Sequence, residues 1–357
     1  MNPSNPDSPP LSPSPTDSAS SSRPASSAAT ASDAAPTPPL SQPSVADIVE
    51  ALPPTPGSWE AIANEILPLN APSGGLATGA RRGRNPRYPG TSVSSSGVTS
   101  FARPQHLHAV AVPVVDDALP FEDALRGRVV SHPTNGDFYF YKRASADVDN
   151  SFANIPSRLE MALKTERFPA LSETSLDELL FLDIETLGLS SDAPLFLVGL
   201  LYFDGGGKDS CLEQLLARDE TEEKALLAYL TRITKGRTLV TFNGRSFDWP
   251  YIRRRTIHHG LKVGAPGYHF DLLQHARRTW RDHVPNCRLQ TLELYLCGRE
   301  RRDDVPSAQV PAEYERFVEV RHATGRGASI VMPVLHHNAL DVLTMAELLC
   351  LAGDRAV

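Results

Sequence analysis

Two acidic residues two positions apart lie in an apolar stretch of this chain. They are Asp183 and Glu185 in the segment Phe181-Leu182-Asp183-Ile184-Glu185. Because alternate residues of a β-strand share a face, both carboxylates are expected on the same side of one strand. Such a pair repels unless a cation lies between the two groups, and a divalent metal ion fills that role. Taken alone, the pair is explained better by a polar strand end that faces water.

A third acidic residue, Asp248, follows another short apolar segment. The segment from Thr241 runs into Asn243-Gly244, and Asp248 then begins a helical pattern. Asn-Gly is a common turn pair, and Asp is a favourable helix N-cap, so both features have a structural interpretation. That interpretation does not explain why Asp248 follows a strand, when Asp183 and Glu185 already stand near the end of another strand.

A fourth acidic residue, Asp341, belongs to the last helical pattern, expected from about His336 to Leu351. At about 100° per residue, His337 lies ~40° around the helix from Asp341 and His336 lies ~140° away. His337 therefore shares the face of Asp341 if the helix is continuous. An ordinary Asp–His pair on a solvated face is the alternative, and it is preferred for this element alone.

The segments around these residues are expected to form an α/β sheet with an antiparallel side, because three strands run together before strands alternate with helices. The expected strands are Glu178–Ile184, Leu195–Asp204, Cys211–Leu216, Thr238–Phe242 and Tyr268–Asp271. The expected helices are Asp219–Thr234, Asp248–His259, one ending at Arg281, Arg288–Leu296 and His336–Leu351.

Composition divides the chain into three parts. Residues 1–100 are dominated by Pro, Ser, Ala and Thr, which cannot bury enough apolar surface to offset chain entropy, so a disordered tail is expected. Residues 101–175 are an accessory or linker segment in which only Asp137–Tyr141 reads as a strand. Residues 176–353 form the expected folded domain.

Several classes of protein are disfavoured by the same sequence. The start has no secretory signal pattern, and the longest apolar run, Pro194–Phe203, is too short to span a bilayer, so no membrane association is expected. The four cysteines form no CxxC pair, which argues against a zinc site and favours a reducing compartment. We therefore expect a cytoplasmic protein.

The charge distribution leaves two interpretations open. The formal net charge is −7, which is not typical of a nucleic-acid-binding protein. Residues 231–302, however, hold 15 Lys and Arg against 5 Asp and Glu, a local balance of +10. A basic face of this kind can follow phosphates even on a net-acidic protein. A solvated arginine-rich surface explains the same numbers equally well.

Together, the acidic elements resemble the motifs of the DEDD exonuclease superfamily. The matching residues are Asp183 and Glu185, then Asn243, Phe247 and Asp248, then Asp341 with a histidine before it. The chain also resembles the bacterial YprB-like ribonuclease H-like family, over about Leu179–Ala352. That likeness rests on Phe242-Asn243-Gly244, Phe270-Asp271-Leu272-Leu273, Ala276-Arg277-Arg278, Cys287–Glu293, Asp304-Val305-Pro306, His337-Asn338 and Asp341-Val342.

The resemblance implies a fold and an activity. The fold is a ribonuclease H-like mixed sheet of about five strands flanked by helices. The activity is a metal-dependent 3′–5′ exonuclease acting on single-stranded DNA or RNA with two Mg²⁺ or Mn²⁺ ions. Asp183 would bridge both ions, Glu185 and Asp341 would complete one site, and Asp248 would assist the other through water.

The resemblance also implies roles around the metal ligands. His337 would orient or deprotonate the attacking water, while Asn243 and Arg245 would hold the substrate near its 3′ end. Which of the two adjacent histidines has this role remains open. The Tyr branch of the superfamily places its aromatic residue four positions before the last Asp, whereas the His branch places its histidine five positions before it. His337 has the first spacing and His336 the second.

Two other classes of function compete with a nuclease. One is a catalytically silent module that keeps the fold and binds nucleic acid or protein. The other is an interaction protein whose tail recruits partners while the domain serves as scaffold. The presence of all four carboxylates argues against both, and binding of metal ions would separate them from an enzyme.

Overall fold

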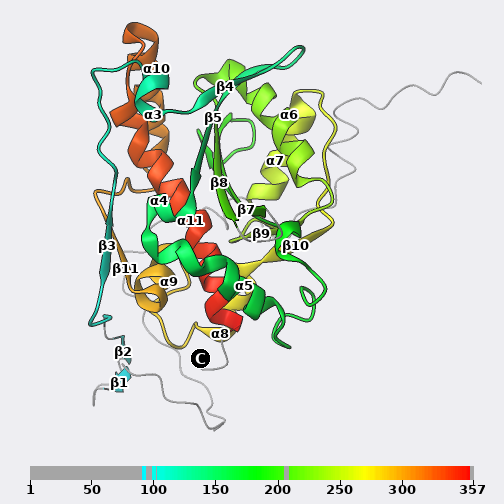
Figure 1. The fold of residues 1–357 in the computed structure, drawn as a ribbon, viewed down its shortest axis with the longest axis vertical. Coiled ribbons are helices and arrows are strands. Elements are labelled where there is room, and N and C mark those ends of the chain that lie inside the picture. The colour runs from blue at the N-terminus through cyan, green and yellow to red at the C-terminus, as the bar shows by residue number, and fades with distance from the viewer. Residues whose placement is uncertain (1–90, 94–98, 102, 205–208, 354–357) are drawn as a thin grey trace, which may run out of the picture. The chain divides into compact units, whose positions relative to one another are not determined.

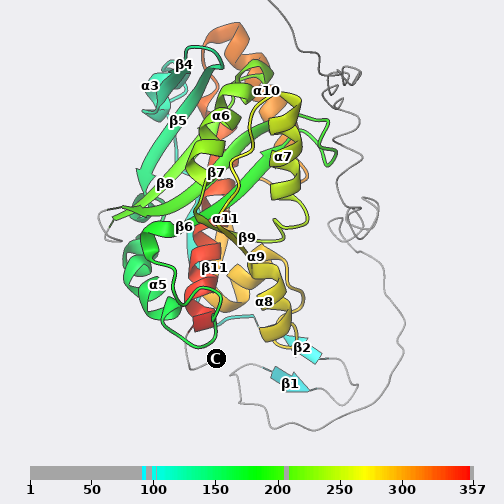
Figure 2. The same cartoon turned by 90° about the vertical axis from the view of Figure 1, so that its right-hand side faces the viewer.

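The computed structural model of the chain describes residues 91–93, 99–101, 103–204 and 209–353. Over these residues the architecture is a seven-stranded mixed sheet with helices on both faces (Figures 1 and 2). Apart from residues 91–93 and 99–100, the tail predicted to be disordered lies outside the described residues. Two short strands at its end, β1 (Thr91–Val93) and β2 (Thr99–Phe101), pair antiparallel.

The main sheet combines a parallel side and an antiparallel side. Its strands, in spatial order, are β10 (Tyr268–Asp271), β9 (Thr238–Thr241), β6 (Leu179–Thr186), β7 (Leu195–Asp204), β8 (Asp209–Leu216), β5 (Gly136–Ala144) and β4 (Arg128–His132). The pairs β10–β9 and β9–β6 are parallel, whereas β6, β7, β8, β5 and β4 pair antiparallel in turn. The predicted mixed α/β sheet with an antiparallel side is therefore confirmed.

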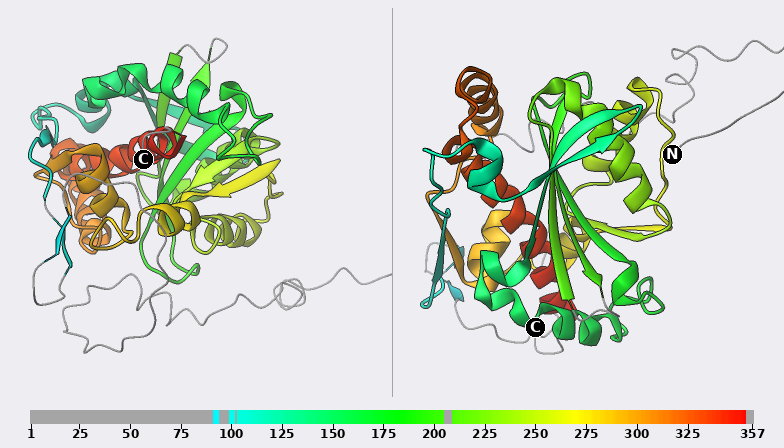
Figure 3. Two further views of the ribbon diagram at one scale, coloured as in Figure 1. Left: turned by 90° about the horizontal axis from the view of Figure 1, so that it is seen from below. Right: turned by 45° about the horizontal axis from the view of Figure 1, so that its top comes forward.

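The helices separate into two layers. They are α3 (Phe121–Leu125), α4 (Ser145–Val148), α5 (Ile155–Leu163), α6 (Glu223–Thr234), α7 (Asp248–His258), α8 (Leu272–Thr279), α9 (Leu289–Leu292), α10 (Val310–Thr324) and α11 (Ala328–Gly353). The long helix α11 crosses one face of the sheet, and α6 and α7 cover the other (Figure 3). A π-helical turn at Glu293–Cys297 follows α9.

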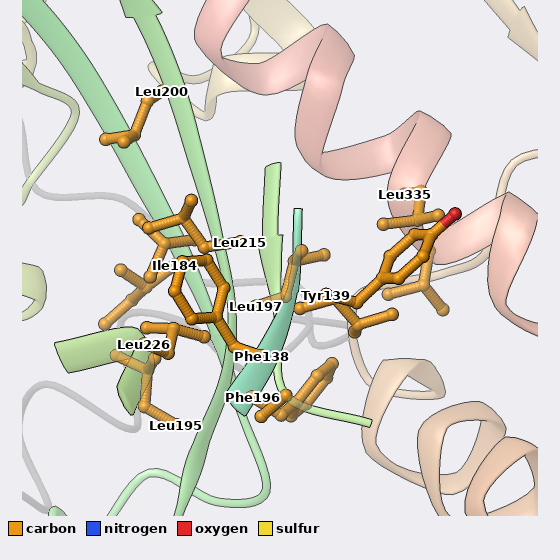
Figure 4. Close-up of a cluster of buried hydrophobic side chains, with 14 of the residues drawn as sticks. Phe138, Tyr139, Ile184, Leu195, Phe196, Leu197, Leu200, Leu215, Leu226 and Leu335 are labelled. Carbon is orange, nitrogen blue, oxygen red and sulfur yellow. The ribbon is translucent and has the colours of Figure 1, made fainter. Parts of the chain in front are cut away.

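Side chains of β6 alternate between these two layers. Leu182 and Ile184 pack in the same hydrophobic cluster as Leu226 of α6, whereas Phe181 packs with Leu343 of α11. Figure 4 shows Ile184 and Leu226 on one side of the strands, with side chains facing α11 on the other. The odd-numbered positions of β6 therefore face α11, as period-two alternation predicts.

The segment 101–175 contributes to the folded unit. The predicted strand at Asp137–Tyr141 is confirmed and extends over all of β5, which pairs with both β4 and β8. These two strands raise the sheet from the five expected to seven. A further strand, β3 (His108–Ala111), forms a separate parallel pair with β11 (Arg299–Arg302). Every residue of β4 is at least partly exposed, so its sequence lacks the apolar alternation that would have revealed it.

Helix α11 begins earlier than the sequence indicated. It starts at Ala328 and continues past Pro333, whereas the predicted start was about His336. A proline inside a helix removes one backbone hydrogen bond, which is why the pattern suggested a later start. By length and composition α11 is apolar enough to cross a membrane, and 83% of its most apolar window is buried within the protein. A core helix gives the same signal.

Candidate metal centre

Three elements bring the four predicted carboxylates together. Asp183 and Glu185 project from β6, Asp248 is the first residue of α7, and Asp341 lies midway along α11. Each of the other three carboxylates raises the pKa of Asp183, which places them all within electrostatic reach of it. The cluster therefore joins the sheet, the helix on one face and the helix on the other.

Close packing of α11 on the sheet sets the position of Asp341. Asp183 is paired across the β6–β7 ladder with Gly199. A Cβ atom at Gly199 would lie 2.3 Å from Oδ1 of Asn338, a contact that no real side chain makes. The absent side chain lets the helix approach the strand at the level of Asp183, three residues before Asp341.

A tight loop between β9 and α7 positions Asp248. Asn243 adopts a left-handed conformation with φ of 67°, and a Cβ at Gly244 would lie 2.4 Å from Oγ1 of Thr241. Asp248 was predicted as a possible N-cap, but the cap position is Phe247 and Asp248 is the first helical residue. Its carboxylate is consequently free to turn toward β6, where the backbone amide of Ile184 hydrogen bonds to it.

Asp271 holds the loop that carries the two predicted substrate-binding residues. Its carboxylate accepts hydrogen bonds from the backbone amides of Asn243 at 2.9 Å and Arg245 at 3.1 Å, and it also caps α8 through Leu273 at 3.1 Å. One carboxylate thus caps α8 and fixes the loop. The guanidinium of Arg245 is exposed and donates to the carbonyl of His269 on the edge strand β10.

Burial and mutual repulsion govern the protonation of the cluster. Burial raises the pKa of Asp183 well above its ordinary value, and the neighbouring carboxylates raise it further. Burial likewise raises the pKa of Glu185 to about 8, although His337 opposes the shift. The pKa of Asp248 rises to about 7, first through burial. The folded chain thus holds carboxylates whose charged forms are disfavoured until a cation offsets them.

Two side chains for which the sequence predicted no role contact the cluster. Asn338 donates from Nδ2 to Oδ2 of Asp183 at 2.9 Å, and Arg301 of β11 donates to Oδ1 of Asp341 at 2.6 Å. Over the described residues, no three His, Cys, Asp or Glu side chains are arranged so that they could hold a metal ion as they stand. Asp183 instead faces Asn338, and Asp341 faces Arg301.

The two candidate histidines differ sharply in their surroundings. Nε2 of His337 lies 3.5 Å from Oδ2 of Asp341, and Nδ1 lies 3.0 Å from the carboxylate of Asp304. Neither ring nitrogen of His336 has a hydrogen-bond partner in the described part of the chain. Burial lowers the pKa of His336 to about 4, so it is a neutral core residue. The continuous helix therefore places His337, not His336, beside Asp341.

The arginine-rich stretch 231–302 divides into buried and exposed members. Arg255 pairs with Glu223, and Arg299 and Arg301 both pair with Glu293, all within the protein interior. The exposed arginines are at positions 232, 245, 253, 277, 278, 281, 288 and 302, and most of them lie on or near α7, α8 and α9. Part of the predicted positive balance is thus used in structural ion pairs.

Comparison with known proteins identifies the domain. Residues 180–352 match the model of the RNase_H superfamily. This segment is a YprB-like ribonuclease H-like domain. It is 32% identical over 178 residues to the uncharacterized protein YprB of Bacillus subtilis (strain 168), an alignment that covers 48% of this chain and 41% of YprB. The alignment thus spans less than half of the length of YprB.

Two solved structures share part of the chain's backbone path. Escherichia coli exonuclease I in a zinc-bound complex with single-stranded DNA has a TM-score of 0.29 and 15% identity, covering 42% of each chain. The same enzyme in complex with a dA16 oligonucleotide has a TM-score of 0.28 and 14% identity, covering 43% of this chain and 41% of that one.

Proposed function

We propose that this chain is a metal-dependent 3′–5′ exonuclease that hydrolyses phosphodiester bonds of single-stranded nucleic acid. The observation that carries the proposal is the buried cluster of Asp183, Glu185, Asp248 and Asp341. Burial raises the pKa of the first three, so the cluster destabilises the fold unless cations bind it. Membership of residues 180–352 in the RNase_H superfamily supports the same chemistry.

The donor set fits Mg²⁺ or Mn²⁺. All four candidate ligands are carboxylates, and hard divalent cations prefer oxygen donors. Asp183 would contact two ions, Glu185 and Asp341 would complete one site, and Asp248 would support the other through water. When bound, two such ions would supply an activated water and stabilise the leaving oxygen.

The remaining roles fall to residues of the chain itself. Burial lowers the pKa of His337, but Asp341, the hydrogen bond to Asp304 and Glu185 outweigh burial and raise it to about 9 in the metal-free chain. His337 is proposed to accept a proton from the attacking water at Nε2, the ring atom that faces Asp341, once bound cations offset these carboxylates. Asn243 and Arg245 are proposed to hold the 3′-terminal nucleotide, since the loop that carries them leads directly into Asp248. Their loop is fixed by Asp271, so little ordering is required when substrate binds.

A catalytically silent module is the second candidate function. The observation that favours it is the ion pair between Arg301 and Asp341, because a resident guanidinium already offsets one carboxylate. Titration with Mn²⁺ separates the two candidates. An enzyme of the proposed kind binds two ions and loses that binding in Asp183→Asn, whereas a silent module has no need of either ion.

End-labelled oligonucleotides test the activity directly. With Mg²⁺ or Mn²⁺, we expect 5′-labelled single-stranded DNA or RNA to shorten one nucleotide at a time from the other end. The 3′-labelled substrate should release labelled mononucleotide at once. Asp183→Asn is the matched control and should leave both substrates intact. Internal cleavage products would indicate an endonuclease, and no cleavage of any substrate would contradict the proposed function.

A further inference from the structure

His337 is held from both ends of its ring. Its side chain is 2% exposed. Nδ1 lies 3.0 Å from Oδ1 and 3.0 Å from Oδ2 of Asp304, so both carboxylate oxygens address one ring nitrogen. The opposite nitrogen, Nε2, lies 3.5 Å from Asp341 and 3.4 Å from Oγ of Ser307. The ring therefore connects Asp304 on one side with the acidic cluster on the other.

Asp304 is not one of the predicted metal ligands or substrate-binding residues. It lies just after β11, and Arg301 of that strand approaches its carboxylate at 3.6 Å. Its side chain is 13% exposed, and burial alone would raise its pKa. The hydrogen bond from His337 and the charges of His337 and Arg301 outweigh burial and hold that pKa below its ordinary value. Asp304 is thus kept as a carboxylate that can accept a hydrogen bond.

We propose that Asp304 is the positioning residue of His337. It accepts a hydrogen bond from Nδ1–H, which fixes the orientation of the ring and directs Nε2 at Asp341, 3.5 Å away. The hydrogen bond made by one ring nitrogen determines the state of the other, so a carboxylate at Nδ1 prepares Nε2 as a proton acceptor. This inference rests on the proposed function, in which His337 receives a proton from water.

A different role for Asp304 predicts different behaviour. Asp304 also raises the pKa of Glu185, so it could act as one more acidic group of the metal centre. A ligand role would weaken metal binding when Asp304 is replaced. A positioning role would leave metal binding unchanged and slow only the step in which His337 takes part.

The chain offers matched variants for this test. Asp304→Asn removes the carboxylate but keeps the size of the side chain, and Asp304→Glu keeps the carboxylate. Asp303→Asn makes the same charge change one residue away, at an exposed position with φ of 59°, where asparagine is readily accommodated. All are made in the full chain, alone and, for Asp304→Asn, combined with His337→Ala.

The kinetic outcome is a split between rate and affinity. We expect Asp304→Asn to lower kcat by about 10- to 100-fold, while KM and Mn²⁺ affinity stay within about threefold. Asp304→Glu should recover part of the rate, and Asp303→Asn should match the wild type. The double variant should be no slower than His337→Ala, because both changes remove one function. The proposal would be overturned if the kcat losses of the two single variants multiplied in the double variant. A tenfold loss of Mn²⁺ affinity in Asp304→Asn would overturn it as well.

A spectroscopic outcome separates this proposal from the proposed function. Nuclear magnetic resonance of Mg²⁺-saturated protein with ¹⁵N-labelled histidine should show the proton of His337 on Nδ1. The His337 signal is assigned as the one that disappears in His337→Ala. In Asp304→Asn the proton should move to Nε2, because the amide can donate to Nδ1. A tautomer unchanged by Asp304→Asn overturns the positioning role even in an active enzyme. If the wild type cleaves nothing but the tautomer still changes in Asp304→Asn, only the proposed function is contradicted.

Discussion

At Asp183, burial and three neighbouring carboxylates all act in the same direction. The charged form of its carboxylate is disfavoured in the metal-free chain. Among the described residues, Asn338 is the only one whose side chain donates a hydrogen bond to that carboxylate. Function and stability therefore oppose each other at this residue. The charge that would bind a cation is the charge that the empty fold tolerates least.

Replacing Asp183 should consequently separate activity from stability. We expect Asp183→Asn to reduce hydrolysis by roughly a thousandfold or more, since metal-based charge stabilisation contributes several kcal/mol and each 1.4 kcal/mol is tenfold in rate. The melting temperature of the metal-free protein should rise by a few degrees, because the repulsion falls. Thermal denaturation with EDTA and the nuclease assay measure the two effects. Full activity in this variant would exclude the proposed metal site.

The two adjacent histidines should behave differently when each is replaced by alanine. His337→Ala should lose about 10²-fold or more in rate, the usual scale for a general base. His336→Ala should lose far less rate and should instead lower stability, because it empties a site in the core. Single-turnover rates and urea midpoints distinguish these outcomes. A larger rate loss for His336→Ala would reverse the assignment.

Sequence reasoning found the residues whose spacing is local. Asp183 with Glu185 follows from strand alternation, and His337 with Asp341 follows from helical spacing. Arg301 was not identified, because β11 reads Arg-Glu-Arg-Arg and such a run is typical of a solvated surface. Asp304 entered only through the family resemblance, without a predicted role. Only tertiary contact shows that charges from this strand are buried against Glu293 and Asp341.

At the scale of elements, the strands and helices of residues 176–353 were predicted well where burial is regular. Strands β7 and β10 have the predicted bounds, and β6 and β9 differ by one or two residues. Helix α11 was predicted to start eight residues too late, since Pro333 obscured its first turns. Strand β4 gave no usable pattern because it is largely exposed. Strand β3 gave none because its partner, β11, is far away in the sequence.

Glu223 connects the two helices on the face of the sheet opposite α11. Its carboxylate accepts hydrogen bonds from Arg255 and His259 of the α7 region and from the backbone amide of Leu195, where β7 begins. The side chain is 1% exposed. The hydrogen bonds from Arg255 and His259 lower the pKa of Glu223, outweighing burial, which acts in the opposite sense.

Glu223→Gln should therefore be strongly destabilising, by about 3–5 kcal/mol, because Arg255 is left buried without its counter-charge. Since the folded-state pKa of Glu223 is below its ordinary value of 4.5, the charged group contributes stability above that pH. The contribution is lost as the pH falls through the folded-state pKa. Urea unfolding at pH 7 and at pH 3 should show a smaller difference from wild type at the lower pH.

The exposed Glu220→Gln serves as the control for this prediction. It should change the free energy of unfolding by less than about 0.5 kcal/mol. A pH-independent difference between Glu223→Gln and wild type would show that the lost charge is not the cause of the destabilisation.

For the whole molecule, the folding unit extends beyond the segment that matches the superfamily. Strand β5 pairs with β8 from Tyr139 to Ala144, and Asp149 forms a buried ion pair with Arg299 at 3.2 Å. Arg299 in turn shares Glu293 with Arg301, which contacts Asp341. Residues before 180 thus support the strand that reaches the candidate site.

Two truncations test this view. A chain that starts at residue 103 should melt within a degree or two of the full chain, because the removed composition buries little surface. A chain that starts at residue 176 should fail to fold cooperatively, since it exposes β8 as an unpaired edge and leaves Arg299 without Asp149. Circular dichroism melting curves measure both. A cooperative transition in the shorter chain would show that residues 180–352 fold alone.

The contact between Gly199 and Asn338 has a consequence for how this domain tolerates mutation. Any Cβ at position 199 displaces Asn338 from Asp183 or lifts α11 from β7, and Asp341 moves with the helix. In a saturation scan read out by nuclease activity, position 199 should therefore be as intolerant as the acidic positions, with alanine already deleterious. Such a scan would rank Gly199 with the catalytic residues, although it contributes no side chain to the reaction. The quantity under constraint at this position is the distance between β7 and α11, which glycine, the smallest residue, preserves.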